Sequence, residues 1–288
     1  MSETWTIRRI VKWIEGDLAP RGIGSPRLDA ELIVAQALGV DRVKLYLDLE
    51  RPLAPAELTA IRGLVARRRK REPMAYLRGR REFYGRDMIV TPSVLVPRPE
   101  TETLVELALG AMPPDLDVRA LDLCTGSGCV GVTLLAERPR AHVVLTDLSD
   151  EALDVARRNA DAHGALPRAR WGSGDLYVAL APDEAAFDVI TANPPYIAER
   201  ERASLEPDVR DFEPGLALFA PEEGLAVVRR IAEGAGRWLV PGGALFVEIG
   251  MAQGRAASEL FERAGLADVR VHPDLGGRDR VVEGRRRA

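Results

Sequence analysis

The chain has 288 residues, of which 46% are hydrophobic, and a formal net charge of -4. This length suffices for one large domain and a smaller one with a substantial core, and the acidity argues against a dominant nucleic-acid surface. No run of about 18 apolar residues appears, and the start of the chain leads into an amphipathic segment instead of a signal peptide. We therefore expect a globular cytoplasmic protein without a membrane partner.

Residues 1–81 have helical periodicity. Apolar residues recur at helical spacing from Ile7 to Leu18, and Ser25-Pro26 begins a second helix that stops near Gly39. Asp41 and Pro55 mark two further helix starts. The apolar stripes are typical of a bundle core and carry no catalytic constellation, so this region is predicted to be an N-terminal helical domain.

Two basic clusters follow the bundle pattern, at 67–71 and 78–81. They fit either a solvated helix end or a docking surface for a partner. Residues 82–99 then predict a hairpin or extended linker, with Gly85 and Asp87 available for its turn.

From about Glu100 to the C-terminus the pattern alternates between strands and helices. This βαβ alternation predicts an α/β fold, a doubly wound Rossmann-like sheet whose ligands lie at the carboxyl ends of the strands. The expected strands are 119–123, 142–146, 187–192, 244–249 and a segment near 269–271, and the expected helices are 130–137, 150–163, 222–238 and 252–264.

The first of these strands runs into a glycine-rich loop. Gly126 and Gly128 permit a tight turn that brings backbone N–H groups against a ligand, in front of a helix N-terminus. Gly131 completes a G-x-G-x-x-G pattern, so a dinucleotide site is a serious alternative. Cys124 and Cys129, the two cysteines of the chain, form neither a disulfide framework nor a zinc set, and no metal site is expected.

Acidic residues end the next two units of the pattern. Asp147 follows the second strand, about 20 residues after the glycine loop, where a carboxylate accepts both ribose hydroxyls of an adenosine. Asp147 alone also fits a helix N-cap. Asp175-Leu176 follows a possible third strand and is positioned for adenine.

The sequence Asn193-Pro194-Pro195-Tyr196 directly follows a buried apolar strand. Asn193 has a side-chain carbonyl, and the prolines have carbonyls but no N–H, so the turn presents acceptors where most loops present donors. Two acceptors suit the two hydrogens of a planar NH2 group, and Tyr196 supplies a flat face on which such a group could stack. Alone, the motif also fits a rigid strand-to-loop turn.

Together these motifs resemble the protein-glutamine methyltransferases that modify peptide chain release factors, the PrmC or HemK family. The resemblance covers nearly the whole chain, and its most specific part is the Pro-Arg-Pro-Glu-Thr-Glu segment, because amino-directed DNA methyltransferases share the glycine loop and Asn-Pro-Pro-Tyr. Cys124 departs from the pattern, since the family usually has glycine there. The matching segments are 96–102, 122–128, Asp147, 193–196, and 248–250 followed by Gln253.

The resemblance implies that S-adenosylmethionine lies across the strand ends, with its amino-acid part at the glycine loop, its ribose on Asp147 and its adenine near Leu176. The cofactor-binding residues so implied are Cys124, Thr125, Gly126, Ser127, Gly128, Asp147, Asp175, Leu176 and Asn193.

The implied substrate is the side-chain amide of a glutamine in a Gly-Gly-Gln loop of a release factor. Asn193 Oδ1 and the Pro194 carbonyl would each accept one amide hydrogen, and Pro195 and Tyr196 would complete the substrate-binding turn. The apolar segment 94–96 would form another wall. No general base is required beforehand, so His142, His163 and His272 are expected to have no catalytic role. The helical domain would read the body of the release factor, and the enzyme is expected to be a monomer that binds no nucleic acid stably.

Several alternatives remain at the level of sequence. An adenine-N6 DNA methyltransferase would use the same acceptors on a flipped base, but its channel should be broadly basic. An NAD-dependent oxidoreductase would leave the Asn-Pro-Pro-Tyr turn unused. A non-enzymatic nucleotide-binding scaffold, whose helical domain recruits a partner, would need a pocket that is empty or unproductive. The nearest alternative is a related glutamine methyltransferase that acts on a ribosomal protein.

Overall fold

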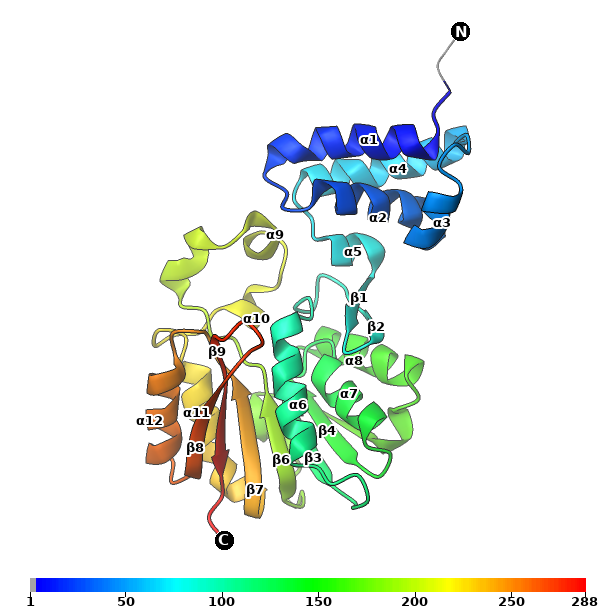
Figure 1. The fold of residues 1–288 in the computed structure, drawn as a ribbon. Coiled ribbons are helices and arrows are strands. Elements are labelled where there is room, and N and C mark those ends of the chain that lie inside the picture. Colours follow the sequence, from blue (N-terminus) through cyan, green and yellow to red (C-terminus); the bar gives the residue numbers. More distant parts are fainter. Residues whose placement is uncertain (1–3) are drawn as a thin grey trace. The chain divides into compact units, whose positions relative to one another are not determined.

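The computed structural model describes residues 4–288 and divides into two compact units (Figure 1). One contains the chain up to Gly79 together with the segment Glu206–Phe212. The other contains Arg80–Leu205 and Glu213–Ala288. None of the helices within residues 4–288 is long and apolar enough to cross a membrane.

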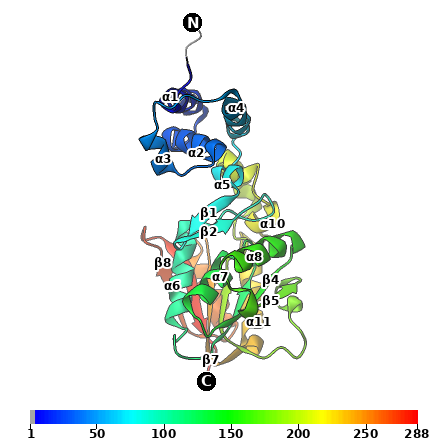
Figure 2. The ribbon, with the colours of Figure 1, turned by 90° about the vertical axis from the view of Figure 1, so that its right-hand side faces the viewer.

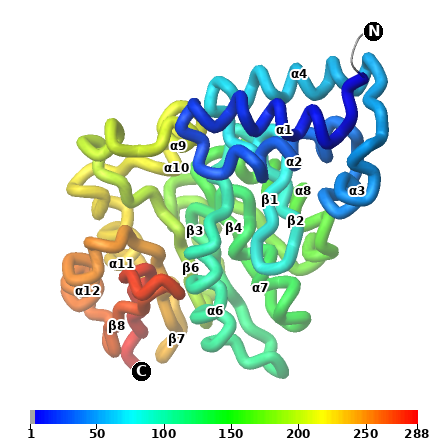
Figure 3. The backbone as a smooth tube through the Cα atoms, turned by 45° about the horizontal axis from the view of Figure 1, so that its top comes forward, coloured from blue at the N-terminus to red at the C-terminus, as the bar shows by residue number. Residues whose placement is uncertain are grey.

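The first unit is helical, as the periodicity predicts. In chain order its helices are α1 (Ile7–Leu18), η1 (Ala19–Arg21), α2 (Pro26–Leu38), α3 (Arg42–Leu47), α4 (Pro55–Arg69), α5 (Met74–Arg78) and α9 (Pro207–Arg210). Helix α2 packs against α1 and α4 (Figure 3), around buried Ile14, Leu18, Ile33 and Ile61. Gly39 ends α2 in the left-handed conformation with φ of 65°, which explains why glycine stands there. Helix α5, a single turn, was not predicted because it has too few residues for a periodic signal.

Much of the first basic cluster is paired within the helical unit. Arg68 is buried and donates to Asp29 and Asp208, each at 2.6 Å. Arg71 pairs with Glu206 at 2.9 Å and also with Asp208. Because a buried guanidinium needs such partners, these contacts tie the segment Glu206–Phe212 to the helical unit. These arginines are therefore structural, not a free basic surface.

The second unit begins with the hairpin predicted at the linker. Strands β1 (Arg80–Phe83) and β2 (Arg86–Ile89) pair antiparallel. The turn places Tyr84 and Gly85 at positive φ, 50° and 71°. Two successive positive φ angles are the mark of a tight hairpin turn. Asn159 then anchors β2, since its side chain bonds the N–H of Ile89 at 2.6 Å and the Ile89 carbonyl at 3.0 Å.

The main sheet has seven strands in the order β5-β4-β3-β6-β7-β9-β8. The pairs from β5 through β4, β3 and β6 to β7 are parallel, and β9 pairs antiparallel with both β7 and β8. The predicted Rossmann-like α/β class is confirmed, and β9 was missed. The strands are β3 (Arg119–Leu123), β4 (His142–Asp147), β5 (Ala169–Ser173), β6 (Phe187–Ala192), β7 (Leu239–Glu248), β8 (Ala267–Pro273) and β9 (Asp279–Arg285).

Helices cover both faces of this sheet (Figures 1 and 2). Alternate strand residues such as Ala120, Val143 and Phe246 pack with α6, α7 and α8. Their neighbours, such as Leu121 and Val247, pack with α11 and α12 on the other face, as the period of two in a strand requires. The helices are η2 (Pro99–Thr101), α6 (Glu102–Gly110), α7 (Cys129–Glu137), α8 (Asp150–Ala162), η3 (Leu166–Arg168), η4 (Leu176–Ala179), η5 (Glu199–Ser204), α10 (Gly215–Leu218), α11 (Ala226–Trp238) and α12 (Gly254–Arg263).

The order of the strands reverses between β3 and β6. The chain proceeds from β3 outward to β4 and β5, and then crosses back to place β6 on the other side of β3. Loops leaving two such strands diverge at the carboxyl edge and open a crevice there. The glycine loop and the Asn193 turn leave β3 and β6, so they flank this crevice.

Candidate active site

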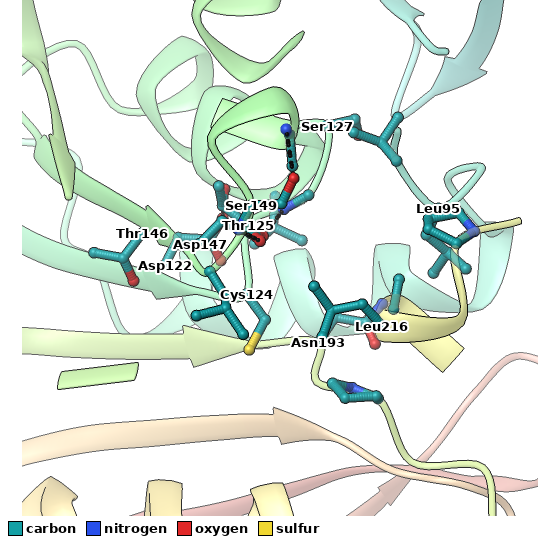
Figure 4. A pocket seen from close by; sticks show the side chains of 18 of the residues that line it. Leu95, Asp122, Cys124, Thr125, Ser127, Thr146, Asp147, Ser149, Asn193 and Leu216 are labelled. Carbon is teal, nitrogen blue, oxygen red and sulfur yellow. Dashed lines mark hydrogen bonds between the residues drawn. The ribbon is translucent and has the colours of Figure 1, made fainter. Parts of the chain in front are cut away.

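A cavity of about 310 Å³ lies at this carboxyl edge, within the larger unit (Figure 4). The glycine loop and Asp147 lie on one side of it, and Asn193 and Leu216 lie across from them. Of the sequence-predicted site residues, the cavity wall contains Cys124, Thr125, Gly126, Ser127, Asp147, Asp175, Leu176, Asn193 and Pro195, whereas Gly128, Pro194 and Tyr196 are not part of it.

Asp122 organises the glycine loop from below. Its Oδ2 accepts from the Thr125 hydroxyl at 2.5 Å and from Gly131 N–H at 3.1 Å, and its Oδ1 accepts from the Thr191 hydroxyl at 2.8 Å. Burial raises the pKa of Asp122 to about 6, and these donors oppose the rise. Asp122 belongs to the predicted motif, and a charged residue between Leu121 and Leu123 is unusual in a buried strand, but the sequence did not predict its partners.

The loop needs the backbone freedom that its glycines supply. Gly126 and Gly128 have φ of 54° and 79°, and Cys124 adopts the same left-handed region with φ of 54°. Glycine adopts that conformation most easily, and Cys124 adopts it as an L-residue. Gly131 has another role, because an added Cβ would lie 2.6 Å from Leu145 Cδ2. It lets α7 approach β4 closely.

The two cysteines of the cavity wall are not activated as thiolates. Burial raises the pKa of the Cys124 and Cys129 thiols, which favours their protonated form. Within residues 4–288 no group of His, Cys, Asp and Glu side chains is arranged to hold a metal ion.

Asp147 lies where β4 ends and faces the glycine loop. Its Oδ2 accepts from Gly126 N–H at 2.8 Å and its Oδ1 from Ser149 N–H at 3.0 Å. Burial raises the pKa of the carboxyl, and these backbone donors counteract the rise. Each carboxylate oxygen has a further lone pair, so both retain capacity for a ligand hydroxyl. The N-cap of the next helix is Ser149, which leaves Asp147 available to the cavity.

The part of the cavity wall around Leu176 is apolar and carries one ion pair at its edge. Leu176 lines the cavity, with φ of 53°, beside the wall residues Leu148 and Val227. Asp175 accepts from Arg230 Nη2 at 2.7 Å. A flat apolar group would meet hydrocarbon here, with a charged pair at its rim.

Asn193 directly follows β6 and reaches into the cavity. Its Nδ2 donates to the Thr101 hydroxyl at 3.2 Å, and this contact leaves Oδ1 as the free polar atom of the amide. Pro195 also lines the cavity, while Pro194 is buried behind it. Thr101 lies in the Pro-Arg-Pro-Glu-Thr-Glu segment, which the sequence marked without assigning a role to this residue.

Tyr196 turns toward the end of β7. Its hydroxyl donates to Glu248 Oε1 at 3.3 Å, and burial raises its pKa strongly. The Tyr196 carbonyl accepts from Gln253 Nε2 at 2.9 Å. Gly224 must be glycine, because a Cβ there would collide with that carbonyl. The Glu248 and Gln253 positions of the motif therefore hold the Asn193–Tyr196 turn.

The remaining wall comes from two segments that a buried carboxylate joins. Glu213 Oε2 accepts from Val96 N–H at 3.1 Å, and the other oxygen of Glu213 pairs with Arg98. These contacts fix the predicted segment 94–96, whose Val94 and Leu95 line the cavity, to the segment that contains α10 and contributes Leu216 and Phe219. Sequence reasoning missed Glu213, because its partners Val96 and Arg98 lie more than a hundred residues away in the chain.

The histidines lie elsewhere. His163 contacts the Asp87 carbonyl at 3.0 Å, and His272 contacts Glu283 at 2.9 Å. His142 is exposed at the amino end of β4. None of the three is in the cavity wall as described.

Two family models match the chain. The first is described as the PrmC N-terminal domain and matches residues 9–79, and the second is the methyltransferase small domain, matching residues 101–206. A release factor glutamine methyltransferase of Geobacter sulfurreducens is 45% identical over 98% of both chains. One of Cereibacter sphaeroides is 47% identical over 93% of this chain and 94% of its own.

Solved structures share the fold at low identity. A methyltransferase from Pyrococcus furiosus has a TM-score of 0.53 at 18% identity and covers 72% of this chain and 91% of its own. The Thermus thermophilus 16S rRNA N2 G1207 methyltransferase, solved with AdoMet and guanosine, has a TM-score of 0.52 at 19% identity, covering 72% of this chain and 50% of its own. These likenesses place the larger unit in the methyltransferase fold.

Proposed function

This chain belongs to the release factor glutamine methyltransferase family, and from that premise we propose that it methylates the N5 atom of the glutamine in the Gly-Gly-Gln motif of peptide chain release factors. The enzyme is an S-adenosylmethionine-dependent methyltransferase. The adenine-directed, NAD-dependent and ribosomal-protein alternatives are not favoured, because none accounts for relatives matched over the whole chain.

The cavity residues fit S-adenosylmethionine, which when bound supplies an electrophilic methyl group on a sulfonium. Asp147 would hold the ribose through its remaining lone pairs, and Leu176 with Asp175 would flank the adenine. The loop from Cys124 to Gly128, in front of the α7 N-terminus, would hold the amino-acid part. Asp147 supplies negative charge near a positively charged ligand.

The observation that carries the substrate assignment is the fixed amide of Asn193. Since Nδ2 is engaged by Thr101, Oδ1 accepts one hydrogen of the glutamine NH2. The carbonyl of Pro194, which is bonded to the wall residue Pro195, would accept the other although the Pro194 ring lies outside the wall. Two acceptors orient the amide nitrogen and stabilise the positive charge that develops on it, and this compensates for its poor nucleophilicity. The proton leaves after transfer, so no histidine is required.

The helical unit, predicted to span residues 1–81, would bind the body of the release factor. A single glutamine loop makes too small a contact to select one protein, whereas specific interfaces bury about 1,200–2,000 Å². We place the enzyme in the cytoplasm with its translation-factor substrate, as a monomer that holds no nucleic acid stably.

The direct test is incubation of the protein with labelled S-adenosylmethionine and purified release factors, followed by mass spectrometry of the Gly-Gly-Gln peptide. We expect one added methyl group on the glutamine side chain, and none on a factor whose glutamine is replaced by alanine. Label on another residue, or on a ribosomal protein instead, would reject the assignment.

A further inference from the structure

Helix α8 lies directly behind the glycine loop, residues 124–128. A Cβ added at Gly128 would be 3.0 Å from Ala156 Cβ, so little space separates the loop from the helix. Asn159 lies three residues after Ala156 on the same face of α8 and is fully buried. Burial of a side-chain amide costs free energy unless its polar atoms find partners. The partners of Asn159 therefore define its role.

Asn159 joins the glycine loop to strand β2. Its Nδ2 donates to the Ser127 carbonyl at 2.8 Å and to the Ile89 carbonyl at 3.0 Å. Its Oδ1 accepts from Ile89 N–H at 2.6 Å. All three partners are backbone groups that can only donate or only accept, so turning the amide over would place like groups against each other. The side chain is a fixed three-point link between the two segments.

The β2 end of this link leads into the apolar wall of the cavity. Three residues separate Ile89 from Ser93, which lines the cavity with its neighbour Val94. A hydrogen bond from Val94 N–H to the Thr91 carbonyl at 3.1 Å closes the turn between them. Asn159 therefore holds the approach to this wall as well as the glycine loop.

We propose that Asn159 is a positioning residue that fixes the glycine loop and the wall segment 93–95 relative to each other. One of these segments would hold the methyl donor and the other would border the glutamine. Displacement of either would separate the reacting atoms, and reaction rates are sensitive to shifts of about 1 Å. The inference rests on the proposed placement of S-adenosylmethionine at the loop and of the glutamine beside segment 93–95.

Helix α8 also supplies a matched control. His163, one turn after Asn159, contacts the Asp87 carbonyl of β2 at 3.0 Å. Its ring is outside the cavity wall, and its hydrogen bond reaches the hairpin instead of the glycine loop. His163→Ala therefore removes a bond between α8 and β2 but leaves the bond from α8 to the loop in place.

Three variants of the full-length enzyme test the inference. Asn159→Ala removes all three bonds and should lower kcat about 10- to 100-fold, the range for displaced reacting groups. It should also weaken S-adenosylmethionine binding by up to about tenfold, the effect of one lost hydrogen bond. Asn159→Asp keeps an acceptor for Ile89 N–H but turns a second oxygen toward the two carbonyls, so it should lose at least as much kcat. His163→Ala should keep the wild-type kcat and affinity.

Amide hydrogen exchange tests the link without turnover. In wild type, saturating S-adenosylmethionine should slow exchange of the Ile89 amide together with that of the glycine loop. Ile89 is outside the cavity wall, and Asn159 joins it to the loop. In Asn159→Ala only the loop should respond, whereas His163→Ala should behave as wild type does. No response of Ile89 in wild type would overturn the inference even if Asn159→Ala did not fold.

Two kinetic outcomes would also overturn it. One is a wild-type kcat in folded Asn159→Ala, and the other is an equal loss of kcat in His163→Ala, since docking of the hairpin would then explain both. The proposed function fails separately. A response of Ile89 to S-adenosylmethionine without methylation of any release factor would refute the proposed function and support the link.

Discussion

Asp147 binds its own chain through both carboxylate oxygens, to Gly126 and Ser149, before any ligand arrives. A ribose would therefore meet a carboxylate that is already oriented, and little ordering would oppose its binding. The position of Asp147 at a strand end was predictable from sequence, but its backbone donors were not, because they depend on how the glycine loop folds back over β4.

Removal of the Asp147 carboxylate should weaken the binding of the cofactor without unfolding the protein. For Asp147→Ala we expect binding of S-adenosylmethionine to lose roughly 1–3 kcal/mol, the range for hydrogen bonds to a charged group. Calorimetric titration measures this, with Asp183→Ala on a surface loop as the control. An unchanged affinity in a folded Asp147→Ala variant would rule out the ribose contact.

At the scale of elements, the parallel strands and their helices were predictable because buried parallel strands and amphipathic helices have strong periodic patterns. Strand β9 was not predicted, since Asp279–Arg285 carries charged residues among its apolar ones and pairs with β7 and β8 only in the folded chain. Glu213 was missed for the same reason: its role depends on contacts that form only in the folded chain. Its partners Val96 and Arg98 lie more than a hundred residues away in the sequence.

The contact between α7 and β4 depends on Gly131. Gly131→Ala places a Cβ 2.6 Å from Leu145 Cδ2 and 3.1 Å from Asp122 Oδ2, so we expect a loss of about 1–3 kcal/mol in unfolding free energy. Gly236→Ala in α11 is the matched control, because nothing lies within 4 Å of its added Cβ. That substitution should stabilise the protein by up to about 1 kcal/mol. Denaturant unfolding measures the unfolding free energy of both variants. Equal values for Gly131→Ala and Gly236→Ala would contradict a close contact between α7 and β4 at Gly131.

Titration of Glu248, the last residue of β7, should make the free energy of unfolding depend on pH. Burial raises the pKa of Glu248 to about 7 from 4.5, despite Arg280 and the Thr101 and Tyr196 hydroxyls, with Glu100 adding to the rise. The folded state therefore holds this proton more tightly than the unfolded chain. The stability that the proton contributes is present below about pH 4.5 and is lost as pH rises to about 7.

Glu248→Gln should remove this dependence. Between pH 4.5 and 7.5, the unfolding free energy of wild type should fall by roughly 3 kcal/mol relative to that of Glu248→Gln, since one pKa unit corresponds to about 1.36 kcal/mol. Subtracting the two curves cancels other carboxyls such as Asp122. Parallel curves would show that Glu248 titrates normally.

At the scale of the whole molecule, the chain leaves the larger unit after Leu205, contributes Glu206–Phe212 to the helical unit, and re-enters the larger unit at Glu213. In sequence, this segment lies between the Asn193 turn and Glu213. This return of the chain to the helical unit was not predictable from the sequence, because it depends on ion pairs of buried Arg68 and half-buried Arg71 with a residue about 140 positions away. The two-domain organisation itself follows from the change of period near Glu100.

The division of labour between the units predicts how truncation acts. A fragment starting at Glu82 should still bind S-adenosylmethionine, because its cavity residues all lie in the larger unit. It should lose methylation of intact release factor, and a short Gly-Gly-Gln peptide should be a poor substrate for both forms. We would measure kcat/KM for both substrates after confirming the fold by circular dichroism. Equal activity of fragment and full chain on intact factor would make the helical unit a stabilising bundle only.

The central claim, that Asn193 orients the reacting amide, is tested most directly by single-turnover methylation of release factor with Asn193→Ala. We expect S-adenosylmethionine affinity close to wild type and a methyl-transfer rate lower by about 10²–10³, the usual cost of losing one preorganised polar partner. Asn193→Asp should also fail to orient the amide, although its charge would favour the sulfonium. A wild-type transfer rate in Asn193→Ala, measured on the same intact factor, would contradict the account.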